Sequence, residues 1–555
     1  MTAHSEGSRR EPTGGDVLVQ VMRRHGIDTA FGVISIHNLP LVEAVARELN
    51  YVEMRHEAAV VNAADGYARA SGKIGVALTS TGTGAGNAAG SMLEALTAGS
   101  RVLHITGQID SPYLGSGRGV IHEVPKQLQM LDAVSKFAKT IVEAKGVEAD
   151  LEEAIAHILS SPTGPASVEW PSDLQYLARP QDQRPFSVTT ADPIEFDESE
   201  IARAVDLLAA ARRPLIWVGG GAAAAKRPLT SILHKLGAGL LTSNSGRAVV
   251  GEDDDLVIGN FASDPRLGSI LAEADVLLAV GTHFRSNETK SYTLALPDNI
   301  VQVDIDPAAI GRVYPAAAGI VGDATAVLTA VDAKLTEAAT DATWPIEMTR
   351  TRNLVRKDLN EYIGGYADIC RAIRQVLPRE SVVARDVTIP SSQWGNRLLD
   401  FYERETNIFP LGGGIGQGLA MGIGASRARR DVPTVVIAGD GGLAVHLGEL
   451  ASLAGTEAWL IVLLFNDGGY GVLRNMQEAN GLDRAGVDLF TPRFDLLAAS
   501  MDMHYDLVRS TDHFEDTFSA AVRLRRPVLI EVDVTALEPA PGAFTPPVHI
   551  PTHSQ

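Results

Sequence analysis

Short apolar runs alternate with amphipathic helical stretches along most of the chain. Residues 74–79 and 102–106 are apolar runs of strand length, and the preceding residues 58–70 show the spacing of apolar positions that a helix requires. This alternation predicts parallel strands joined by crossover helices, because a parallel pair needs a connection long enough to return across the sheet. The pattern therefore predicts an α/β fold.

The same alternation occurs in three successive blocks. A chain of 555 residues is too long for one hydrophobic core and is typical of about three domains. We expect three doubly wound parallel-sheet domains, with a linker at 338–351 before the third. The predicted domains are residues 16–184, 185–340 and 352–536, with a disordered N-terminus at 1–15 and a flexible tail at 537–555.

The most informative stretch is 435–470, where two apolar runs each end in oxygen-bearing side chains. Asp440 follows the first run, and Asn466 and Asp467 follow the second. Because neighbouring parallel strands bring their carboxyl ends to one edge of a sheet, these oxygens should converge. Converging hard oxygens suit Mg²⁺ or Ca²⁺, and a glycine turn that opens a helix suits a phosphate. The stretch predicts a metal that bridges a diphosphate to the protein; the alternative is an ordinary βαβ unit with an acidic turn.

Composition excludes several classes of partner. The net charge is −20 and the pI is near 5.2, which argues against nucleic acid or an anionic membrane surface as a partner. No apolar run approaches the length of a membrane span, and the N-terminus does not resemble a signal peptide. The single cysteine, Cys370, excludes an intrachain disulfide and fits a cytoplasmic location.

The motif at 439–467 resembles the signature of enzymes that use thiamine diphosphate (ThDP). In that signature Gly-Asp-Gly is followed by some two dozen residues and an Asn pair; here 24 residues separate Gly441 from Asn466, and Asp467 replaces the second Asn. Arg55-His56-Glu57, with Asp-Gly-Tyr-Ala-Arg at 65–69, resembles the pyrimidine-binding half of the same site. The resemblance covers residues 16–535 and is to the acetolactate synthase, 2-oxo acid decarboxylase and benzaldehyde lyase-like group.

The resemblance implies where ThDP and Mg²⁺ bind. The implied metal ligands are the side chains of Asp440 and Asp467 and the carbonyl of Gly469. The Ile415 side chain is expected beneath the cofactor, and the Gly413 carbonyl against its amino group. The other implied cofactor-binding residues are Glu57, Gly439, Gly441, Gly442 and Tyr470. In the family the cofactor lies between two subunits, which implies a homodimer or homotetramer.

Glu57 has an implied catalytic role. A Glu shielded from water can share its proton with a nitrogen of the aminopyrimidine ring, whose imino form then removes the proton from the thiazolium carbon. The cofactor supplies the nucleophile, so the protein need not provide one. A Glu at the start of a helix is also often only a partner of the helix dipole.

Two loop histidines, His37 and His122, are the catalytic candidates beside Glu57. Benzaldehyde lyase-like enzymes carry a His at the position that matches His37, and His122-Glu123 resembles a segment of the guanidino-oxopentanoate decarboxylase branch. Loop histidines are equally often solvated polar residues. Further candidates for substrate contact are Ile36, Thr83, Asn87, Glu123, Arg474 and Gln477, with helix capping as an equal alternative for Thr83 and Asn87.

The central block contains Gly219-Gly220-Gly221 after an apolar run at 214–218. The GxGxxG spacing of dinucleotide-binding folds is absent, which favours a tight strand-to-helix turn and argues against an NAD-dependent dehydrogenase. Acetolactate synthases carry FAD in this domain and show a Phe-Asp-Asp-Arg type of segment. The matching residues 282–287 read Thr-His-Phe-Arg-Ser-Asn, which makes FAD doubtful here.

The resemblance implies an enzyme that decarboxylates a 2-oxo acid to an enamine and joins it to an aldehyde or ketone acceptor, giving an acyloin or acetohydroxy acid. One alternative is a simple 2-oxo acid decarboxylase that releases an aldehyde. A second is a non-catalytic nucleotide-binding homologue, against which Glu57 argues, because a mere binder needs no carboxylate that activates the cofactor. Since no Arg-rich capture site is obvious, a small or apolar 2-oxo acid is the expected substrate class.

Overall fold

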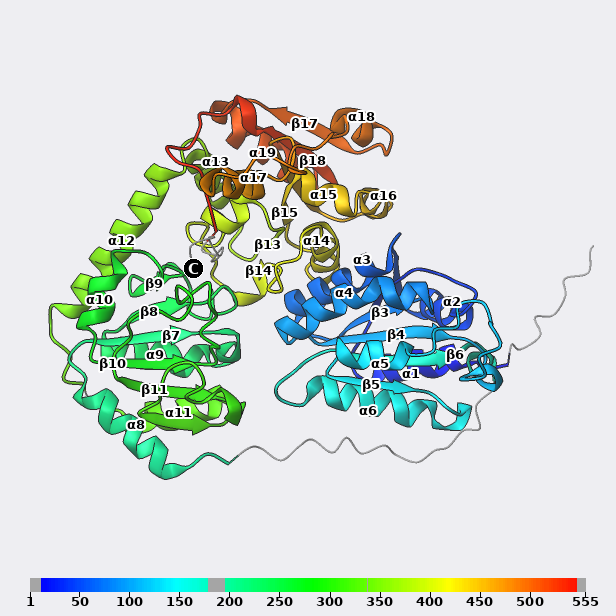
Figure 1. Ribbon diagram of the computed structural model, residues 1–555, viewed down its shortest axis with the longest axis horizontal. Helices are drawn as coiled ribbons and strands as arrows, with labels where there is room; N and C mark the ends of the chain where they lie inside the picture. The colour runs from blue at the N-terminus through cyan, green and yellow to red at the C-terminus, as the bar shows by residue number, and fades with distance from the viewer. Residues whose placement is uncertain (1–10, 178–194, 337, 547–555) are drawn as a thin grey trace, which may run out of the picture. The chain divides into compact units, whose positions relative to one another are not determined.

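Three six-stranded parallel sheets form the framework of the chain (Figure 1). The computed structural model describes residues 11–177, 195–336 and 338–546. The prediction of an α/β fold with three parallel-sheet domains is confirmed. Within the described residues, no helix combines the length and the apolar character that crossing a bilayer requires.

The N-terminal sheet has the strand order β2-β1-β3-β4-β6-β5. Its strands are β1 (Thr29–Gly32), β2 (Asn50–Glu53), β3 (Gly75–Thr79), β4 (Val102–Gln108), β5 (Phe137–Thr140) and β6 (Ala166–Pro171). Its helices are α1 (Gly14–Arg24), α2 (Leu39–Glu48), α3 (Glu57–Ser71), α4 (Thr83–Ala98), α5 (Gln127–Ala133), α6 (Val147–Leu159) and α7 (Ser172–Tyr176). Leu18, Leu41 and Ile155 carry α1, α2 and α6 onto one face of the sheet, and α3 and α4 lie on the other face (Figure 1).

The central sheet has the order β12-β11-β10-β7-β8-β9. Its strands are β7 (Pro214–Val218), β8 (Gly239–Thr242), β9 (Val257–Gly259), β10 (Val276–Val280), β11 (Asn299–Asp304) and β12 (Ala318–Val321), and its helices are α8 (Glu198–Ala210), α9 (Lys226–Leu236), α10 (Leu267–Glu273) and α11 (Ala324–Lys334). Along β7, Ile216 and Val218 pack on one face, whereas Leu215 and Trp217 pack on the other. Because both faces are covered, this strand consists of a continuous apolar run.

The triple glycine of the central domain serves close packing. A Cβ atom added to Gly219 would lie 2.2 Å from the carbonyl oxygen of Gly281, and one added to Gly221 would lie 2.7 Å from the Gly281 Cα atom. Two backbone segments therefore meet where only glycine fits. This contact supports the interpretation as a tight strand-to-helix turn.

The C-terminal sheet has the order β14-β13-β15-β16-β18-β17. Its strands are β13 (Val382–Arg385), β14 (Asn407–Ile408), β15 (Thr434–Gly439), β16 (Leu460–Asn466), β17 (His504–Val508) and β18 (Val528–Asp533). Its helices are α13 (Tyr366–Val376), α14 (Gly418–Ala428), α15 (Asp440–Val445), α16 (Glu449–Ala454), α17 (Gly471–Ala479), α18 (Phe494–Ala499) and α19 (Phe514–Arg523). The strand, turn, helix and strand predicted for 435–465 are present, but the helix is divided into α15 and α16.

Helix α12 (Trp344–Tyr362) begins inside the stretch predicted as a linker at 338–351. Its buried residues Trp344, Met348 and Val355 recur at helical spacing and anchor it to the central domain. Helix α12 ends at Tyr362, and α13 begins at Tyr366, because Gly364 between them adopts a left-handed backbone conformation with φ +58°. The linker prediction was therefore wrong from residue 344 onward.

The predicted terminal segments lie only partly within the described residues. Helix α1 begins at Gly14, so the expectation of disorder over 1–15 was wrong for its last two residues, and 1–10 fall outside the description. Residues 537–546 have no helix or strand, but the Phe544 carbonyl accepts a hydrogen bond from Asn475. Residues 178–194 and 547–555, which include the predicted end of the first domain and of the tail, are also outside it.

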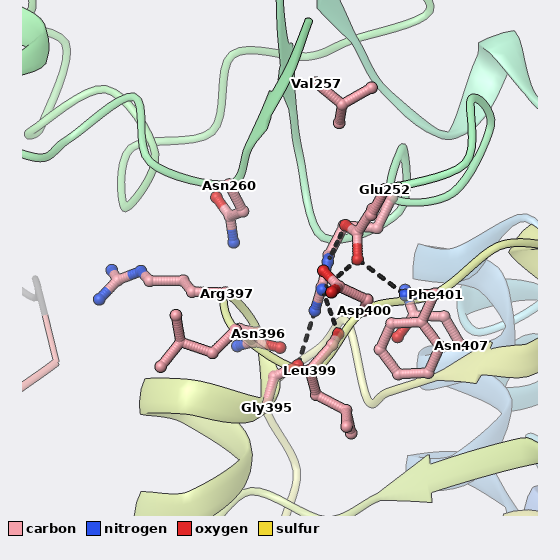
Figure 2. A network of polar contacts seen from close by, with 12 residues as sticks. Glu252, Val257, Asn260, Gly395, Asn396, Arg397, Leu399, Asp400, Phe401 and Asn407 are labelled. Carbon is pink, nitrogen blue, oxygen red and sulfur yellow. Dashed lines mark hydrogen bonds and ion pairs between the residues drawn. The ribbon is translucent and has the colours of Figure 1, made fainter. Parts of the chain in front are cut away.

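The central and C-terminal domains belong to one compact unit, which contains residues 192–422, 429–447 and 453–555. A buried network joins them (Figure 2): the Arg247 guanidinium donates to both oxygens of Glu252 and to the carbonyls of Gly395 and Leu399. Glu252 in turn accepts from the Phe401 N–H at 2.9 Å. Because each buried charge has its partners, the network ties the two domains together.

The other compact unit contains residues 1–191 together with two short segments from later in the chain, 423–428 and 448–452. The first segment lies against α3 so closely that a Cβ atom on Gly424 would be 1.8 Å from the carbonyl oxygen of Ala63. The second segment contains Glu449, which contacts the loop before α3. The unit that contains the N-terminal sheet is therefore completed by residues from much later in the sequence.

Candidate functional site

Glu57 is the first residue of α3, at the carboxyl edge of the N-terminal sheet. Its side chain is half-buried, and its Oε2 atom accepts a hydrogen bond from Asn87 Nδ2 at 3.0 Å. Its Oε1 atom faces the glycine-rich turn, since a Cβ atom on Gly84 would lie 2.8 Å from that oxygen. Glu57 can therefore interact with the dipole of α3 and also present a carboxylate at the sheet edge. Asn87 contacts the predicted catalytic carboxylate and orients it.

The turn from β3 into α4 is held by Gln127, which the sequence pattern did not indicate. Gln127 is buried, and its Oε1 atom accepts from the Gly82 N–H at 2.7 Å and from the Thr81 hydroxyl at 3.1 Å. Thr83 is exposed at the start of α4. No local pattern links Gln127 to a turn more than forty residues earlier, so only the structure reveals this support.

The two candidate histidines, His37 and His122, lie together. Their ring centroids are 5.1 Å apart, and the rings meet edge to face at 87°. His37 is buried, and its Nδ1 atom has no hydrogen-bond partner among the described residues. Burial, followed by the nearby His122 ring, lowers the pKa of His37, while Asp110 opposes that change. The pair can therefore hold or pass a proton at the end of the N-terminal sheet.

The residues around the histidines differ in exposure. Ile36 is 65% exposed and Ile121, next to His122, is 70% exposed. The Glu123 carboxylate accepts from the N–H groups of Gly117, Gly119 and Val120, so it shapes its own loop. His122 has a left-handed backbone conformation with φ 68°, which is costly for a residue with a Cβ atom. Such strain is often found at functional sites.

Asp440 and Asp467 converge at the carboxyl edge of the C-terminal sheet, as predicted. The Asp467 N–H donates to Asp440 Oδ1 at 3.3 Å. Asp440 Oδ2 and Asp467 Oδ1 are buried and lack any hydrogen-bond partner among the described residues. The Gly469 carbonyl oxygen lies 3.0 Å from where a Cβ atom of Gly441 would be. Two carboxylate oxygens and a carbonyl are a donor set that suits Mg²⁺.

The electrostatics of this edge also suit a cation. Burial raises the pKa of Asp440, and burial followed by the charge of Asp440 raises the pKa of Asp467 to about 6. The described residues contain no group of three or more His, Cys, Asp or Glu side chains placed to hold a metal. The donor set here has two carboxylates and needs the main-chain oxygen as its third ligand, so the residues present fit Mg²⁺ with a diphosphate.

The turn at 413–418 is anchored by Asp386, a residue that the sequence analysis missed. Asp386 Oδ1 accepts from the Gly416 N–H at 3.0 Å, and Oδ2 accepts from the Gly418 N–H at 3.2 Å. Gly413 and Gly416 have left-handed backbones, and the Ile415 side chain is 38% exposed between them. Burial raises the pKa of Asp386 to about 6. Its position after β13, beside the end of β15, was the only signal in the sequence.

The residues after β16 mainly stabilise the loop that contains Asp467. Arg474 donates to the carbonyls of Asp467 and Gly468 and to Asp488. Gln477 exchanges hydrogen bonds with the main chain of Ala485. The Tyr470 ring lies against Gly441, Gly439 is the last residue of β15, and Gly442 lies in the first turn of α15.

Comparison with known proteins gives three consecutive domain matches. Residues 12–131 match the model for the N-terminal TPP binding domain of thiamine pyrophosphate enzymes, residues 201–331 the central domain, and residues 390–532 the C-terminal TPP binding domain. TPP is thiamine pyrophosphate, another name for ThDP. The order of the three matches is the order of the three sheets.

Similar proteins match along nearly the whole chain. The probable 2-ketoarginine decarboxylase AruI of Pseudomonas aeruginosa is 30% identical over 527 residues, covering 94% of each chain. The acetolactate synthase isozyme 2 large subunit of Escherichia coli is 27% identical over 553 residues, covering 95% of this chain and 96% of that one. The pyruvate oxidase of Lactiplantibacillus plantarum is 25% identical over 550 residues, covering 95% and 89%. The chain belongs to the thiamine pyrophosphate enzymes, in the group of acetolactate synthases and 2-oxo acid decarboxylases that act as carboligases or decarboxylases.

Proposed function

We propose that this protein uses ThDP and Mg²⁺ to decarboxylate a 2-oxo acid. The observation that carries the proposal is the pair of unpartnered buried oxygens, one on Asp440 and one on Asp467, beside the turn that opens α15. Unpaired buried carboxylate oxygens are costly, so their presence at one edge supports a cation there. Asp440, Asp467 and the Gly469 carbonyl would hold the Mg²⁺, and the turn that opens α15 would bind the diphosphate.

The remaining residues act on the organic part of the cofactor and on the substrate. When bound, ThDP supplies a thiazolium ring that accepts the electron pair released as a 2-oxo acid loses CO₂. Glu57 would share a proton with the aminopyrimidine, and Asn87, which donates to Glu57 Oε2, holds the carboxylate in place. Asp386 holds the turn that contains Ile415 and Gly413. Ile415 would support the cofactor, and the Gly413 carbonyl would accept from its amino group.

The histidine pair favours release of an aldehyde. A pair of imidazoles in contact, one of them buried with a free Nδ1 atom, can deliver a proton to the carbon that has lost CO₂. This outcome agrees with the similarity to a probable 2-ketoarginine decarboxylase. It makes a 2-oxo acid with a guanidinium side chain the first substrate to test, followed by the small or apolar 2-oxo acids expected from the sequence.

Carboligation to an acyloin or acetohydroxy acid is the second candidate. The exposed Ile36 and Ile121 side chains beside the histidines offer an apolar surface for an aldehyde or ketone acceptor. The similarity to acetolactate synthases supports the same reaction. Thr83, Glu123, Arg474 and Gln477 remain candidates for substrate contact.

The proposal includes a homodimer or homotetramer in the cytoplasm. The assembly follows from the resemblance to the family, in which the cofactor lies between two subunits. The buried, unbonded Cys370 agrees with a reducing compartment. We propose no role for FAD, since residues 282–287 lack the segment that acetolactate synthases use.

A panel of 2-oxo acids tests the proposal. The protein is loaded with ThDP and Mg²⁺, and CO₂ and organic products are followed by mass spectrometry with and without added aldehydes. Free aldehyde as the main product supports the decarboxylase, and a hydroxyketone or acetohydroxy acid supports the carboligase. Equal CO₂ release by wild-type protein and by the Glu57→Gln variant would contradict the assignment of Glu57.

A further inference from the structure

Glu449 is a buried carboxylate whose main contacts lie almost 400 residues earlier in the sequence. It is 1% exposed, and its Oε1 atom accepts from the N–H groups of Arg55 and His56, each at 3.0 Å. Its Oε2 atom accepts from the Ser452 hydroxyl at 2.7 Å and lies 3.3 Å from the Arg55 nitrogen. All four residues lie within the compact unit that contains the N-terminal sheet.

These hydrogen bonds supply acceptors for the main-chain N–H groups just before Glu57. The Met54 N–H donates to the Gly32 carbonyl and ends the strand pairing of β2. The next two N–H groups donate to Glu449, and the Ala58 N–H then donates to the His56 ring. Between the last sheet bond and the first turn of α3, Glu449 therefore holds the backbone.

Glu449 could in principle serve only its own helix, since it is the first residue of α16. Its bond to Ser452 has the i to i+3 spacing of such a local role. That role uses one carboxylate oxygen, whereas Oε1 is directed at Arg55 and His56. A local cap has no need of donors from another domain.

We infer that Glu449 is a positioning residue for Glu57: it fixes the Arg55–His56 backbone and thereby the direction in which the Glu57 carboxylate leaves the sheet edge. The inference rests on the proposed role of Glu57. A carboxylate must be held within a fraction of an ångström to share a proton with the aminopyrimidine, so slack in this loop lowers the rate of cofactor activation more than it lowers cofactor affinity.

The test uses a reaction of the bound cofactor that needs no substrate. Holoprotein with ThDP and Mg²⁺ is mixed with D₂O, and the exchange of the hydrogen on the thiazolium carbon is followed by NMR after acid quench. The dissociation constant of ThDP is measured by calorimetry. Amide exchange of the peptide covering residues 54–58 is measured by mass spectrometry in the protein without cofactor.

Two substitutions at position 449 test whether the hydrogen bonds to Arg55 and His56, and not the charge of Glu449, position Glu57. Glu449→Ala removes both acceptors; it should slow exchange at the thiazolium carbon at least tenfold, change the ThDP dissociation constant less than threefold and expose the 54–58 amides. Glu449→Gln keeps an acceptor oxygen for Arg55 and His56, and its amide can donate to the Ser452 hydroxyl. It should restore the rate to within threefold of wild type.

Glu152→Ala is the matched control, because Glu152 is also 1% exposed and bonded, to His25, within the same unit. It should lower thermal stability and leave exchange at the thiazolium carbon unchanged. If Glu449→Ala does not fold, Glu449→Asp, which withdraws the carboxylate by one methylene, should show the same loss in part.

The outcomes also separate this inference from the proposed function. Slow exchange in Glu57→Gln with a wild-type rate in Glu449→Ala, or in Glu449→Asp, would overturn the role of Glu449 alone. A wild-type rate in Glu57→Gln would overturn both. An equal loss of exchange rate in Glu449→Ala and Glu449→Gln would also overturn the role of Glu449, because the hydrogen bonds to Arg55 and His56 survive in the amide variant.

Discussion

The N-terminal and C-terminal sheets have the same strand order but different chemistry at the ends of their strands. Position by position, β2-β1-β3-β4-β6-β5 corresponds to β14-β13-β15-β16-β18-β17. The turn after β3 contains Ser80, Thr81 and Gly82, whereas the turn after the corresponding β15 begins with Asp440. The loop after β2 leads to Glu57, and the loop after β14 leads to the Ile415 turn.

The difference shows what the fold provides and what the side chains add. Each sheet presents strand ends and helix N-termini along one edge. In the C-terminal sheet that edge carries carboxylates with free oxygens, which need a cation. In the N-terminal sheet it carries Glu57 and the imidazoles of His37 and His122, groups that can exchange protons. In the proposed function, one topology would therefore serve metal binding in one domain and proton transfer in the other.

The largest expected effect comes from removing a proposed metal ligand, the Asp440 carboxylate, from the C-terminal sheet. Asp440→Ala should weaken Mg²⁺-dependent retention of ThDP by more than the roughly 10–100-fold that loss of a supporting residue costs a metal site. Asp467→Asn, which restores the amide usual at this position in the family, should retain the cofactor. Calorimetric titration of ThDP with and without Mg²⁺ measures both. Full affinity in Asp440→Ala would refute the metal assignment.

The next effect concerns the N-terminal edge. Glu57→Gln should lower CO₂ release by about 10²–10⁴-fold, the range of a positioned acid or base. ThDP retention should persist, because the metal and diphosphate contacts belong to the other sheet. Steady-state rates and calorimetry give the two quantities. A parallel loss of rate and affinity would mean that the two edges do not divide their tasks.

Asp386→Ala should produce an intermediate effect. It leaves the N–H groups of Gly416 and Gly418 without their acceptor, at a cost of about 1–3 kcal/mol for each buried group that stays unpaired. The turn bearing Ile415 should loosen and ThDP should bind more weakly. Asp323→Ala, which removes the N-terminal cap of α11, is the control: it should lower stability by about 1 kcal/mol with unchanged ThDP affinity.

The histidine pair predicts opposite pH shifts from two substitutions. Burial and the neighbouring His122 lower the pKa of His37 from its usual value, and Asp110 opposes that change. His122→Gln should move the acid limb of the kcat/KM profile upward by less than about one pH unit, since burial remains. Asp110→Asn should move it downward. Shifts in the same direction would contradict the assignment of this limb to His37.

The smallest expected effect is a difference in exchange rate between alanine substitutions at two glycines of α4, Gly84 and Gly86. A methyl group at Gly84 would press on the Glu57 Oε1 atom, whereas nothing lies within 4 Å of one added at Gly86. Gly84→Ala should slow exchange at the thiazolium carbon several-fold, and Gly86→Ala should leave it unchanged while raising helix stability by about 1 kcal/mol. Equal rates in the two variants would show that the turn does not restrain Glu57.

The sequence revealed the elements and residues that local pattern determines. Apolar runs predicted the strands. The glycine and aspartate spacing indicated Asp440 and Asp467, and the resemblance of residues 55–69 to the family indicated Glu57. Helix α12 was missed in its first part, although Trp344 and Met348 are spaced four apart, because Pro345 between them is typical of a connecting segment. Gln127 and Glu449 gave no signal, because their function lies in contacts with residues far away in the sequence, and a single sequence contains no record of such pairs.

Glu449 follows Asp440 by nine residues, yet its contacts are with the loop of Glu57. If sites are shared between subunits as proposed, the Asp440 and Glu449 of one chain support two different sites. Mixed oligomers of Glu57→Gln and Asp440→Ala chains would then keep one intact site in every two. Mixed oligomers of Glu449→Ala and Asp440→Ala chains should regain activity, whereas those of Glu449→Ala and Glu57→Gln chains should not. Residues 440 and 449 would then belong to different complementation groups, although only nine positions separate them.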